Sequence, residues 1–353
     1  MPGYYQPVSP GQIHTPIEAP HNYLCCEISV GLRLEPGRKY EAGREEENLM
    51  SIYERFKSKG PSGFGYGSTA EEVTGGLSLE GKTMLVTGCN SGLGKETLRV
   101  LALRGARVIG TARTFEKAHQ ACATVGGQTV ALACDLSDPA SVRACTASVV
   151  AVGIQLDAII CNAGIMGLPK LERAHGYELQ FFTNHIGHFI LVNGLLEQLS
   201  ATGRVVMLSS AAHIQAAKGG IEFDNLDGSK GYGAWRQYGQ SKFANILFAK
   251  ELARRFTGTQ RTANAVHPGI IKTNLARHNL GARIFYDIIG PILLKTVPQG
   301  AATQVYVATS PALVTVSGKY FADCNIAAPR ADAEDPVTAN TLWKISEQIA
   351  GTV

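Results

Sequence analysis

The sequence predicts a single α/β domain in which helices flank a doubly wound, mainly parallel sheet of about seven strands. From Lys82 onward, short β-branched apolar runs alternate with longer amphipathic segments, which is the pattern of repeated βαβ units. A glycine-rich turn follows the first of these runs. The chain has 353 residues, of which 45% are hydrophobic and 18% charged, so it can bury one large core.

The strands are expected where the β-branched apolar runs lie. They are predicted at 83–87, 107–111, 129–134, 157–161, 204–209 and 262–266, with a last strand around Tyr320 and Phe321. A helix that ends near Leu103 should follow the first strand, and residues 336–350 should form the closing helix.

The region before the first strand has a different composition. Residues 1–49 are rich in proline, glycine and charge without apolar periodicity, which predicts a flexible tail. Residues 50–80 are expected to form a lead-in helix from Met50 through Phe56 and a linker, and Ser68 with Glu71 offers a capping box for a short helix. The α/β domain then occupies 81–353.

Composition also excludes several classes of protein. The net charge of +4 is small and the basic residues are scattered, so no nucleic-acid partner is expected. No apolar stretch approaches the roughly 20 residues of a membrane span, and residues 1–20 lack a secretion signal, so the cytoplasm is the expected compartment. Cysteines stand at positions 25, 26, 89, 122, 134, 145, 161 and 324 without C-x-x-C pairs, which indicates reduced, mostly buried thiols and no metal site.

The turn after the first strand reads T-G-C-N-S-G-L-G. Its glycines at 88, 92 and 94 mark positions where a side chain would obstruct a tight turn, a pyrophosphate or the packing of the next helix. That helix directs its free N–H groups at anionic oxygens. The spacing differs by one residue from G-x-G-x-x-G, and a plain strand-to-helix turn is the alternative. The predicted cofactor contacts in this turn are Gly88, Asn90, Ser91, Gly92, Leu93 and Gly94.

This turn resembles the cofactor loop of the short-chain dehydrogenase/reductase family, and further motifs of that family follow in order between residues 75 and 350. The resemblance implies a Rossmann-like fold. It implies that Asp135, followed by Leu136, contacts the adenine amine, although an ordinary helix N-cap is the alternative for Asp135. It also implies that Asn162, Ala163 and Gly164 border the cofactor and steady the sheet.

The end of the second strand indicates the choice of cofactor. Enzymes that select NAD usually place a carboxylate there, whereas this strand ends Gly110-Thr111-Ala112-Arg113. Arg113 could pair with the 2′-phosphate of NADP(H) through its planar guanidinium. NADP(H) is therefore predicted over NAD(H), with a solvent-facing Arg113 as the alternative.

Tyr238 and Lys242 match the family's Y-x-x-x-K, and a spacing of four on a helix places both on one face. A nearby ammonium and an oxidised nicotinamide would favour the phenolate, so Tyr238 is the predicted acid/base. The resemblance implies that Ser210 orients the substrate oxygen, with Ser209 as the alternative, and that Asn184 supports a proton relay. Tyrosine and lysine at this spacing are also common on surfaces, and it is the ordered motifs that favour catalysis here.

Two further segments complete the predicted site. Pro268 and Gly269, with Ile271 and Thr273, resemble the P-G-x-x-x-T segment that meets the nicotinamide amide. His185 and His188 lie three apart with no acidic partner nearby, so packing or surface roles are expected in place of metal binding.

The predicted substrate is a bulky, lipophilic alcohol, aldehyde or ketone. Ser210 and Tyr238 are 28 positions apart, and the stretch between them, with residues 223–226, resembles the retinol dehydrogenase and WW-domain oxidoreductase branch. The resemblance implies a substrate lid around 274–297, and residues 284–294 add an apolar stretch there. The alternative is that this apolar face belongs to the core or to a homodimer interface. An NADPH-binding redox sensor or assembly component with little turnover is the alternative function.

Overall fold

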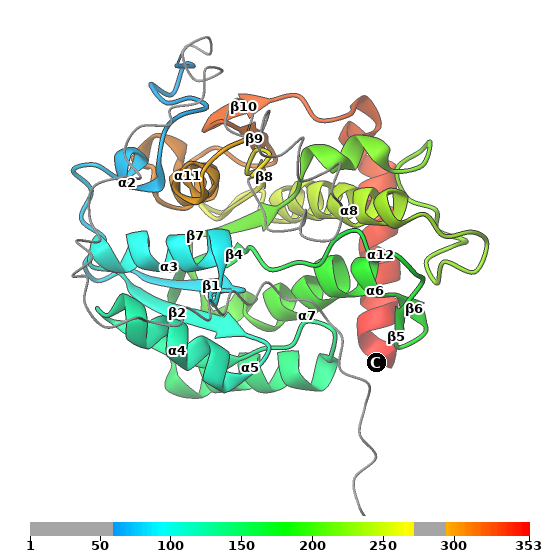
Figure 1. Cartoon of the computed structure of the whole chain (residues 1–353), viewed down its shortest axis with the longest axis horizontal. Helices are drawn as coiled ribbons and strands as arrows, with labels where there is room; N and C mark the ends of the chain where they lie inside the picture. The colour runs from blue at the N-terminus through cyan, green and yellow to red at the C-terminus, as the bar shows by residue number, and fades with distance from the viewer. Residues whose placement is uncertain (1–58, 272–293) are drawn as a thin grey trace, which may run out of the picture. The chain divides into compact units, whose positions relative to one another are not determined.

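A computed structural model describes residues 59–271 and 294–353. The predicted tail, the helix from Met50 and most of the predicted lid lie outside the described residues. The main sheet has the order β10-β9-β8-β7-β4-β1-β2-β3, and every neighbouring pair is parallel except β9 with β10 (Figure 1). Its strands are β1 (Thr83–Thr87), β2 (Arg107–Ala112), β3 (Thr129–Ala133), β4 (Leu156–Cys161), β7 (Leu199–Leu208), β8 (Thr262–His267), β9 (Tyr320–Ala322) and β10 (Asn325–Ala327).

The predicted strands are confirmed within a few residues, and the sheet has eight strands in place of about seven. The difference lies at the end of the sheet, where the strand expected at Tyr320 is a short hairpin of β9 and β10. The turn between them contains Asp323 and Cys324 at positive φ angles of 51° and 61°. A separate two-stranded hairpin joins β5 (Arg173–Ala174) and β6 (Tyr177–Glu178).

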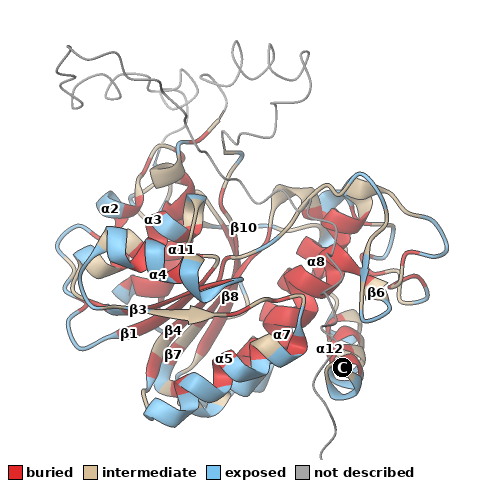
Figure 2. Ribbon diagram, turned by 60° about the horizontal axis from the view of Figure 1, so that its bottom comes forward, coloured by how far each residue is buried: buried red, intermediate tan, exposed pale blue. Residues whose placement is uncertain are grey.

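Helices cover both faces of the sheet, as expected for a doubly wound fold (Figure 2). One face is covered by α2 (Ala70–Val73), α3 (Gly92–Leu103), α4 (Phe115–Val125) and α11 (Val297–Thr309). The other is covered by α5 (Pro139–Val152), α6 (Leu179–Phe181), the π-helix η1 (Phe182–Ile186), α7 (Gly187–Gly194), α8 (Ala234–Arg255) and α12 (Pro336–Thr352). Shorter 3-10 turns lie at η2 (Leu196–Gln198), η3 (Ala211–Gln215), η5 (Pro311–Leu313) and η6 (Ala331–Glu334).

A hydrophobic core lies on each face of the sheet, and successive residues of a strand point alternately into one core and the other. Leu85 of β1 packs with the layer of α7 and α8, whereas Met84 and Val86 pack with the layer of α3 and α11. All five residues of β1 are buried, which explains why the sequence shows continuous apolar runs. The six cysteines in the described residues are free and buried. None of the helices in this part of the chain is both long and apolar enough to cross a membrane.

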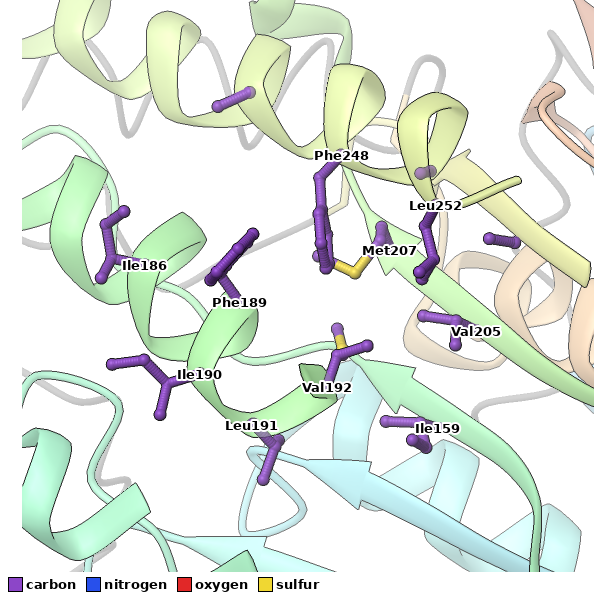
Figure 3. Close-up of a cluster of buried hydrophobic side chains, with 14 of the residues drawn as sticks. Ile159, Ile186, Phe189, Ile190, Leu191, Val192, Val205, Met207, Phe248 and Leu252 are labelled. Atoms are coloured by element: carbon purple, nitrogen blue, oxygen red, sulfur yellow. The ribbon is translucent and has the colours of Figure 1, made fainter. Parts of the chain in front are cut away.

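The core beneath α8 is rich in aromatic rings. Phe189 of α7 lies next to Phe248 of α8, with ring centroids 5.4 Å apart, and Met207 of β7 lies on the other side of Phe248 (Figure 3). Trp343 of α12 stacks on Phe248 at 5.5 Å and meets Phe189 edge-on at 5.0 Å. The Arg255 guanidinium lies over the same indole, 3.8 Å from its centroid. This packing holds α8 against the sheet.

The short helix α2 corrects one prediction. Its capping box is formed by Thr69 and Glu72, one residue later than the predicted Ser68 and Glu71. The Ser68 hydroxyl instead accepts a hydrogen bond from the Gly65 N–H at 3.1 Å, which closes the preceding turn. Ser68 is therefore a turn residue, and Thr69 takes the N-cap.

Candidate active site

The glycine-rich turn joins β1 to α3 at the carboxyl edge of the sheet. Gly88 and Gly92 have φ angles of +69° and +51°, which favour glycine. A Cβ on Gly94 would collide with the Gly88 carbonyl and stand 2.6 Å from the Asn162 amide nitrogen. The turn therefore needs glycine for its backbone path and for the close approach of α3.

The first turn of α3 presents backbone groups. Ser91 is its N-cap residue but forms no side-chain capping bond, so backbone N–H groups there are not satisfied by that side chain. Asn90 is half-buried in the turn. Leu93 and Ile271 both approach Gly300 of α11, where a Cβ would be 2.7 Å and 2.6 Å from their methyl groups. The site residues Leu93 and Ile271 thus meet, although they are far apart in the chain.

The segment after β4 is tied to the end of β1. The Asn162 amide donates to the Thr87 carbonyl at 2.8 Å, and the Ala163 N–H donates to the Thr87 hydroxyl at 2.9 Å. The Thr87 hydroxyl in turn meets His188 Nε2 at 2.9 Å. These contacts hold Asn162 and Ala163 beside the end of β1, next to the glycine-rich turn.

Arg113 and Asp135 follow neighbouring strands. Arg113 stands one residue beyond β2 and is exposed. Asp135 accepts hydrogen bonds from the Ser137 N–H and hydroxyl at 2.9 and 2.6 Å, while α5 is capped by Asp138. The alternative interpretation of Asp135 as the helix N-cap is therefore wrong. Leu136 is buried, and its carbonyl leaves no room for a Cβ on Gly187.

Tyr238 and Lys242 lie one turn apart on α8 and are both buried. The Lys242 ammonium is 5.7 Å from the Tyr238 ring centroid and donates to the Leu208 carbonyl at 3.1 Å. Burial raises the pKa of Tyr238 to about 12, although a hydrogen bond with Ser210 lowers it, and burial lowers the pKa of Lys242 to about 8. Burial is therefore the largest influence on the phenol pKa in the protein alone. The predicted lowering of this pKa by Lys242 together with an oxidised nicotinamide stays a prediction.

The two serines after β7 have different partners. The Ser209 hydroxyl donates to the Lys242 carbonyl at 2.7 Å and is buried. The Ser210 hydroxyl accepts from the Ala212 N–H at 3.1 Å, and Ser210 is near enough to Tyr238 to lower the pKa of the phenol. Ser210 is therefore the serine that meets the phenol, and Ser209 holds the backbone of α8.

Asn184 lies in the π-helix η1, next to this pair. Its amide donates to the Ser241 hydroxyl and the Ile165 carbonyl at 2.9 Å each, and its oxygen accepts from the Ile165 N–H at 2.8 Å. A Cβ on Gly164 would be 3.0 Å from the Asn184 oxygen and 3.2 Å from the Lys242 ammonium. Gly164, Asn184 and Lys242 therefore converge on one point, and the wider turn of η1 directs Asn184 toward it.

His185 and His188 have packing roles. His188 Nδ1 contacts the Asn184 carbonyl at 2.9 Å while Nε2 contacts Thr87. His185 Nε2 meets the Ser346 hydroxyl at 2.8 Å. Burial lowers the pKa of His185 to about 3 and that of His188 to about 4, so both are neutral at neutral pH. In the described part of the chain no group of three or more His, Cys, Asp or Glu is placed to hold a metal ion.

The segment after β8 places Pro268 and Gly269 at the same edge of the sheet. Pro268 is buried, and Gly269 has a φ of +92°. Ile271 forms an isolated parallel bridge with Lys295. Thr273 lies outside the described residues.

The loop between Ser210 and Tyr238 divides into two parts. Leu226 is buried and Phe223 is half-buried in the core beside α12, so these residues face the core. Tyr232 donates to the Leu168 carbonyl at 2.6 Å, close to the segment after Gly164. Trp235, on the first turn of α8, meets the Tyr238 ring edge-on at 6.0 Å and is 53% exposed. Of these two parts, the second lies near the phenol, as does the start of the loop, where the Ala212 carbonyl would be 2.5 Å from a Cβ on Gly239.

Sequence reasoning missed three polar residues that support the site. Thr87 links the end of β1 to Ala163 and His188, and Ser241 holds Asn184. Gln304 of α11 donates to the Asn162 oxygen at 3.1 Å. Thr87 and Ser241 lie inside the quoted motifs, but Gln304 carries no sequence signal because its partner is 142 positions away.

Comparison with known proteins agrees with this geometry. Residues 82–282 match the family model of the short chain dehydrogenases. A short-chain dehydrogenase TIC 32 A, chloroplastic, of Brassica napus is 40% identical over 84% of this chain and 98% of its own length. Human retinol dehydrogenase 11 is 41% identical over 79% of this chain and 88% of its own length.

Among solved structures, an uncharacterised protein of Mycobacterium paratuberculosis is 33% identical. It covers 79% of this chain and 97% of its own, with a TM-score of 0.66. The mainly parallel sheet with helices on both faces is thus shared with a relative of known structure. With its ordered motifs and these matches, the chain belongs to the short-chain dehydrogenase/reductase family, in the retinol dehydrogenase branch, and is an oxidoreductase.

Proposed function

We propose that this chain interconverts an alcohol and a carbonyl on a lipophilic substrate with NADP(H), and that Tyr238 is the acid/base. The observation that carries the proposal is the convergence of Lys242 and Asn184 on Gly164, with the Lys242 ammonium 5.7 Å from the centroid of the Tyr238 ring. Ser210, which lowers the pKa of Tyr238, lies beside them. These residues come from β7, α8, η1 and the end of β4, and converge at the carboxyl edge of the sheet. Ligands of open α/β sheets bind at that edge, where the order of strands reverses.

The residues of this chain fit a dinucleotide. The space beside Gly94 is so narrow that a Cβ would fill it. Because the Ser91 side chain does not cap α3, backbone N–H groups of its first turn stay available for a pyrophosphate. When bound, NADP(H) supplies or accepts the hydride. We propose that Gly88 to Gly94, Asp135, Leu136, Asn162 to Gly164, and Pro268 to Thr273 hold it, with Lys242 on the nicotinamide ribose.

Tyr238 handles the proton in this mechanism. Since its pKa is about 12, the phenol is protonated at neutral pH and can donate to the oxygen of a carbonyl substrate. Ser210 would orient that oxygen through its hydroxyl. Lys242, whose pKa is about 8, is mostly charged at neutral pH and favours the phenolate left after proton donation. A protonated Tyr238 is the form that the reduction of a carbonyl requires.

The preference for NADP(H) rests on Arg113. Its guanidinium is exposed at the carboxyl end of β2, and that strand ends without the acid that would repel a 2′-phosphate. A planar guanidinium can bind a phosphate with two parallel hydrogen bonds.

The lipophilic character of the substrate rests on exposed apolar side chains near Tyr238. Trp235 is half exposed beside the phenol, and its ring lies over Gly167, where a Cβ would be 3.5 Å away. Ile270, next to Gly269, is 60% exposed. Retinol dehydrogenase 11, at 41% identity, is named for a lipophilic alcohol.

The test is a screen of lipophilic alcohols, aldehydes and ketones with NADP(H) and NAD(H), followed by absorbance at the nicotinamide band. We expect turnover of lipophilic carbonyls with NADPH. Trp235→Ala should raise KM for the best lipophilic substrate more than for a short-chain analogue, because it removes apolar contact area. Tight NADPH binding without turnover of any compound would contradict the enzymatic proposal and favour a sensor.

A further inference from the structure

Lys295 buries a positive charge behind the segment proposed to meet the nicotinamide. Its side chain is fully buried, and its ammonium is 2.7 Å from Asp323 Oδ1 in the turn between β9 and β10. The ammonium also lies over the Tyr66 ring, 4.9 Å from its centroid. No residue accepts a well-aligned hydrogen bond from it within the described ranges, so Asp323 and the ring balance its charge.

The stem of Lys295 supports the turn after β8. A Cβ on Gly269 would stand 2.5 Å from the Lys295 Cδ and 2.8 Å from its Cε. The Lys295 N–H donates to the Ile270 carbonyl at 2.8 Å, and the residue pairs with Ile271 in a parallel bridge. Lys295 therefore contacts all three residues from Gly269 to Ile271.

The stability of the fold does not by itself explain why a charged Lys295 is buried behind Gly269. Removing an ammonium from water is costly, and a buried ion pair often stabilises a fold no better than apolar side chains of the same size. The ion pair does, however, fix positions that apolar packing leaves adjustable. It joins three segments that are distant in sequence, namely the turn at Gly269, the turn at Asp323 and the lead-in segment at Tyr66.

We propose that Lys295 is a positioning residue that holds Gly269 to Ile271 where the nicotinamide end of the cofactor binds. This inference rests on the proposed cofactor site and goes beyond it by assigning a role to a residue outside the recognised motifs. Because Lys295 lies behind the segment, its effect should be confined to the nicotinamide end. The adenine end, at the glycine-rich turn and Arg113, should be unaffected.

The experiment compares two ligands that share the adenine end. NADPH reaches both ends of the site, whereas 2′,5′-ADP carries the 2′-phosphate and lacks the nicotinamide. The variant Lys295→Met with Asp323→Asn removes both charges and leaves neither unpaired. We expect the Kd of NADPH to rise about tenfold and that of 2′,5′-ADP to stay within about twofold, as measured by calorimetry. Lys230→Met, in the exposed pair with Asp224, is the matched control and should change neither Kd.

An equal loss of affinity for both ligands would show a general structural role and overturn the proposal, and so would an unchanged Kd for NADPH. If the double variant does not fold, Lys295→Arg tests the same point, because the larger guanidinium must displace the turn at Gly269. A selective loss of NADPH affinity then supports the proposal, and an unchanged ratio of the two Kd values contradicts it. If the parent protein prefers NADH, the proposed cofactor is wrong, and the same ratio measured with NADH and ADP still decides the role of Lys295.

Discussion

The two halves of the site are built in different ways. The cofactor half comprises β1, the glycine-rich turn, α3 and the end of β2; the catalytic half comprises η1, the end of β7 and α8. The cofactor half offers a ligand the backbone of the turn, which carries no side chain at Gly88, Gly92 and Gly94, and the exposed side chain of Arg113. The catalytic half instead buries its polar side chains and pairs them with one another, as Asn184 pairs with Ser241.

The difference reflects what each half would bind. A pyrophosphate is charged, and backbone N–H groups at a helix start can bind it without a side chain. A proton transfer needs groups fixed at their final distances in a place with little water, where electrostatic interactions are stronger. Removing one side-chain group from the catalytic half should therefore lower turnover more than NADPH affinity. Adding a methyl group to the cofactor half should lower NADPH affinity.

The largest effect is expected in the catalytic half. Tyr238→Phe removes the proton donor but keeps the buried ring, so turnover should fall on the order of 10³-fold with little change in the Kd of NADPH. Steady-state kinetics and NADPH titration measure both quantities. Tyr306→Phe, at another buried tyrosine on α11, should keep normal turnover. Substantial activity in Tyr238→Phe would refute the assigned mechanism.

A methyl group in the cofactor half should produce the opposite pattern. Gly94→Ala forces a Cβ into the Gly88 carbonyl, so we expect a loss of about 1–3 kcal/mol in stability and weaker NADPH binding. Thermal melting and titration give the two values. Gly351→Ala on α12, where a Cβ meets nothing within 4 Å, is the control and should cost nothing. Normal NADPH affinity in Gly94→Ala would mean that the turn is not part of the cofactor site.

Acid should destabilise the catalytic half through its neutral histidines. The pKa of His185 is about 3 in the folded protein and about 6.5 when exposed to water. Between these values the unfolded state binds a proton that the folded state does not, so stability is lost as the pH falls below about 6.5, by about 1.4 kcal/mol per pH unit for this group. Between pH 6.5 and pH 4, the free energy of unfolding of His185→Gln should fall less steeply than that of the parent protein. If the free energies of unfolding of the two proteins fell in parallel with pH, the low pKa of His185 would be contradicted.

The smallest effect is expected at the exposed end of the cofactor half. Arg113→Ala should weaken NADPH binding about tenfold and leave NADH unchanged, because one charge-assisted contact to the 2′-phosphate is lost. The dissociation constants of both cofactors in both proteins test this. Equal constants for NADPH and NADH in the parent protein would contradict the proposed preference.

The same contrast explains how much the sequence could predict. The cofactor half was visible because glycine is required wherever Gly94 approaches the Gly88 carbonyl, and such requirements recur at fixed spacing. The strands were visible because burial on both faces makes continuous apolar runs. Tyr238 and Lys242 were visible only through family resemblance, since their spacing alone is common.

Properties that depend on several distant segments were not predictable. The pKa of Tyr238 rises because the folded chain buries the phenol, and no local pattern reports that burial. Lys295 meets Asp323 and Gly269 only after the sheet has formed. The capping box was misplaced by one residue because Ser68 and Thr69 are both good N-cap residues, and the turn to Gly65 decides between them.

The cover that α12 gives to α8 has a consequence for how the protein is made. Trp343 packs on Phe248 and Phe189, yet α12 leaves the ribosome after every strand of the sheet and after α8. Until α12 docks, the growing chain exposes an aromatic surface on α8, the helix that carries Tyr238. Exposed apolar surfaces of this kind bind chaperones and make a folding intermediate prone to aggregation. A nascent chain stalled before Pro336 should therefore bind a hydrophobic dye that the finished protein does not.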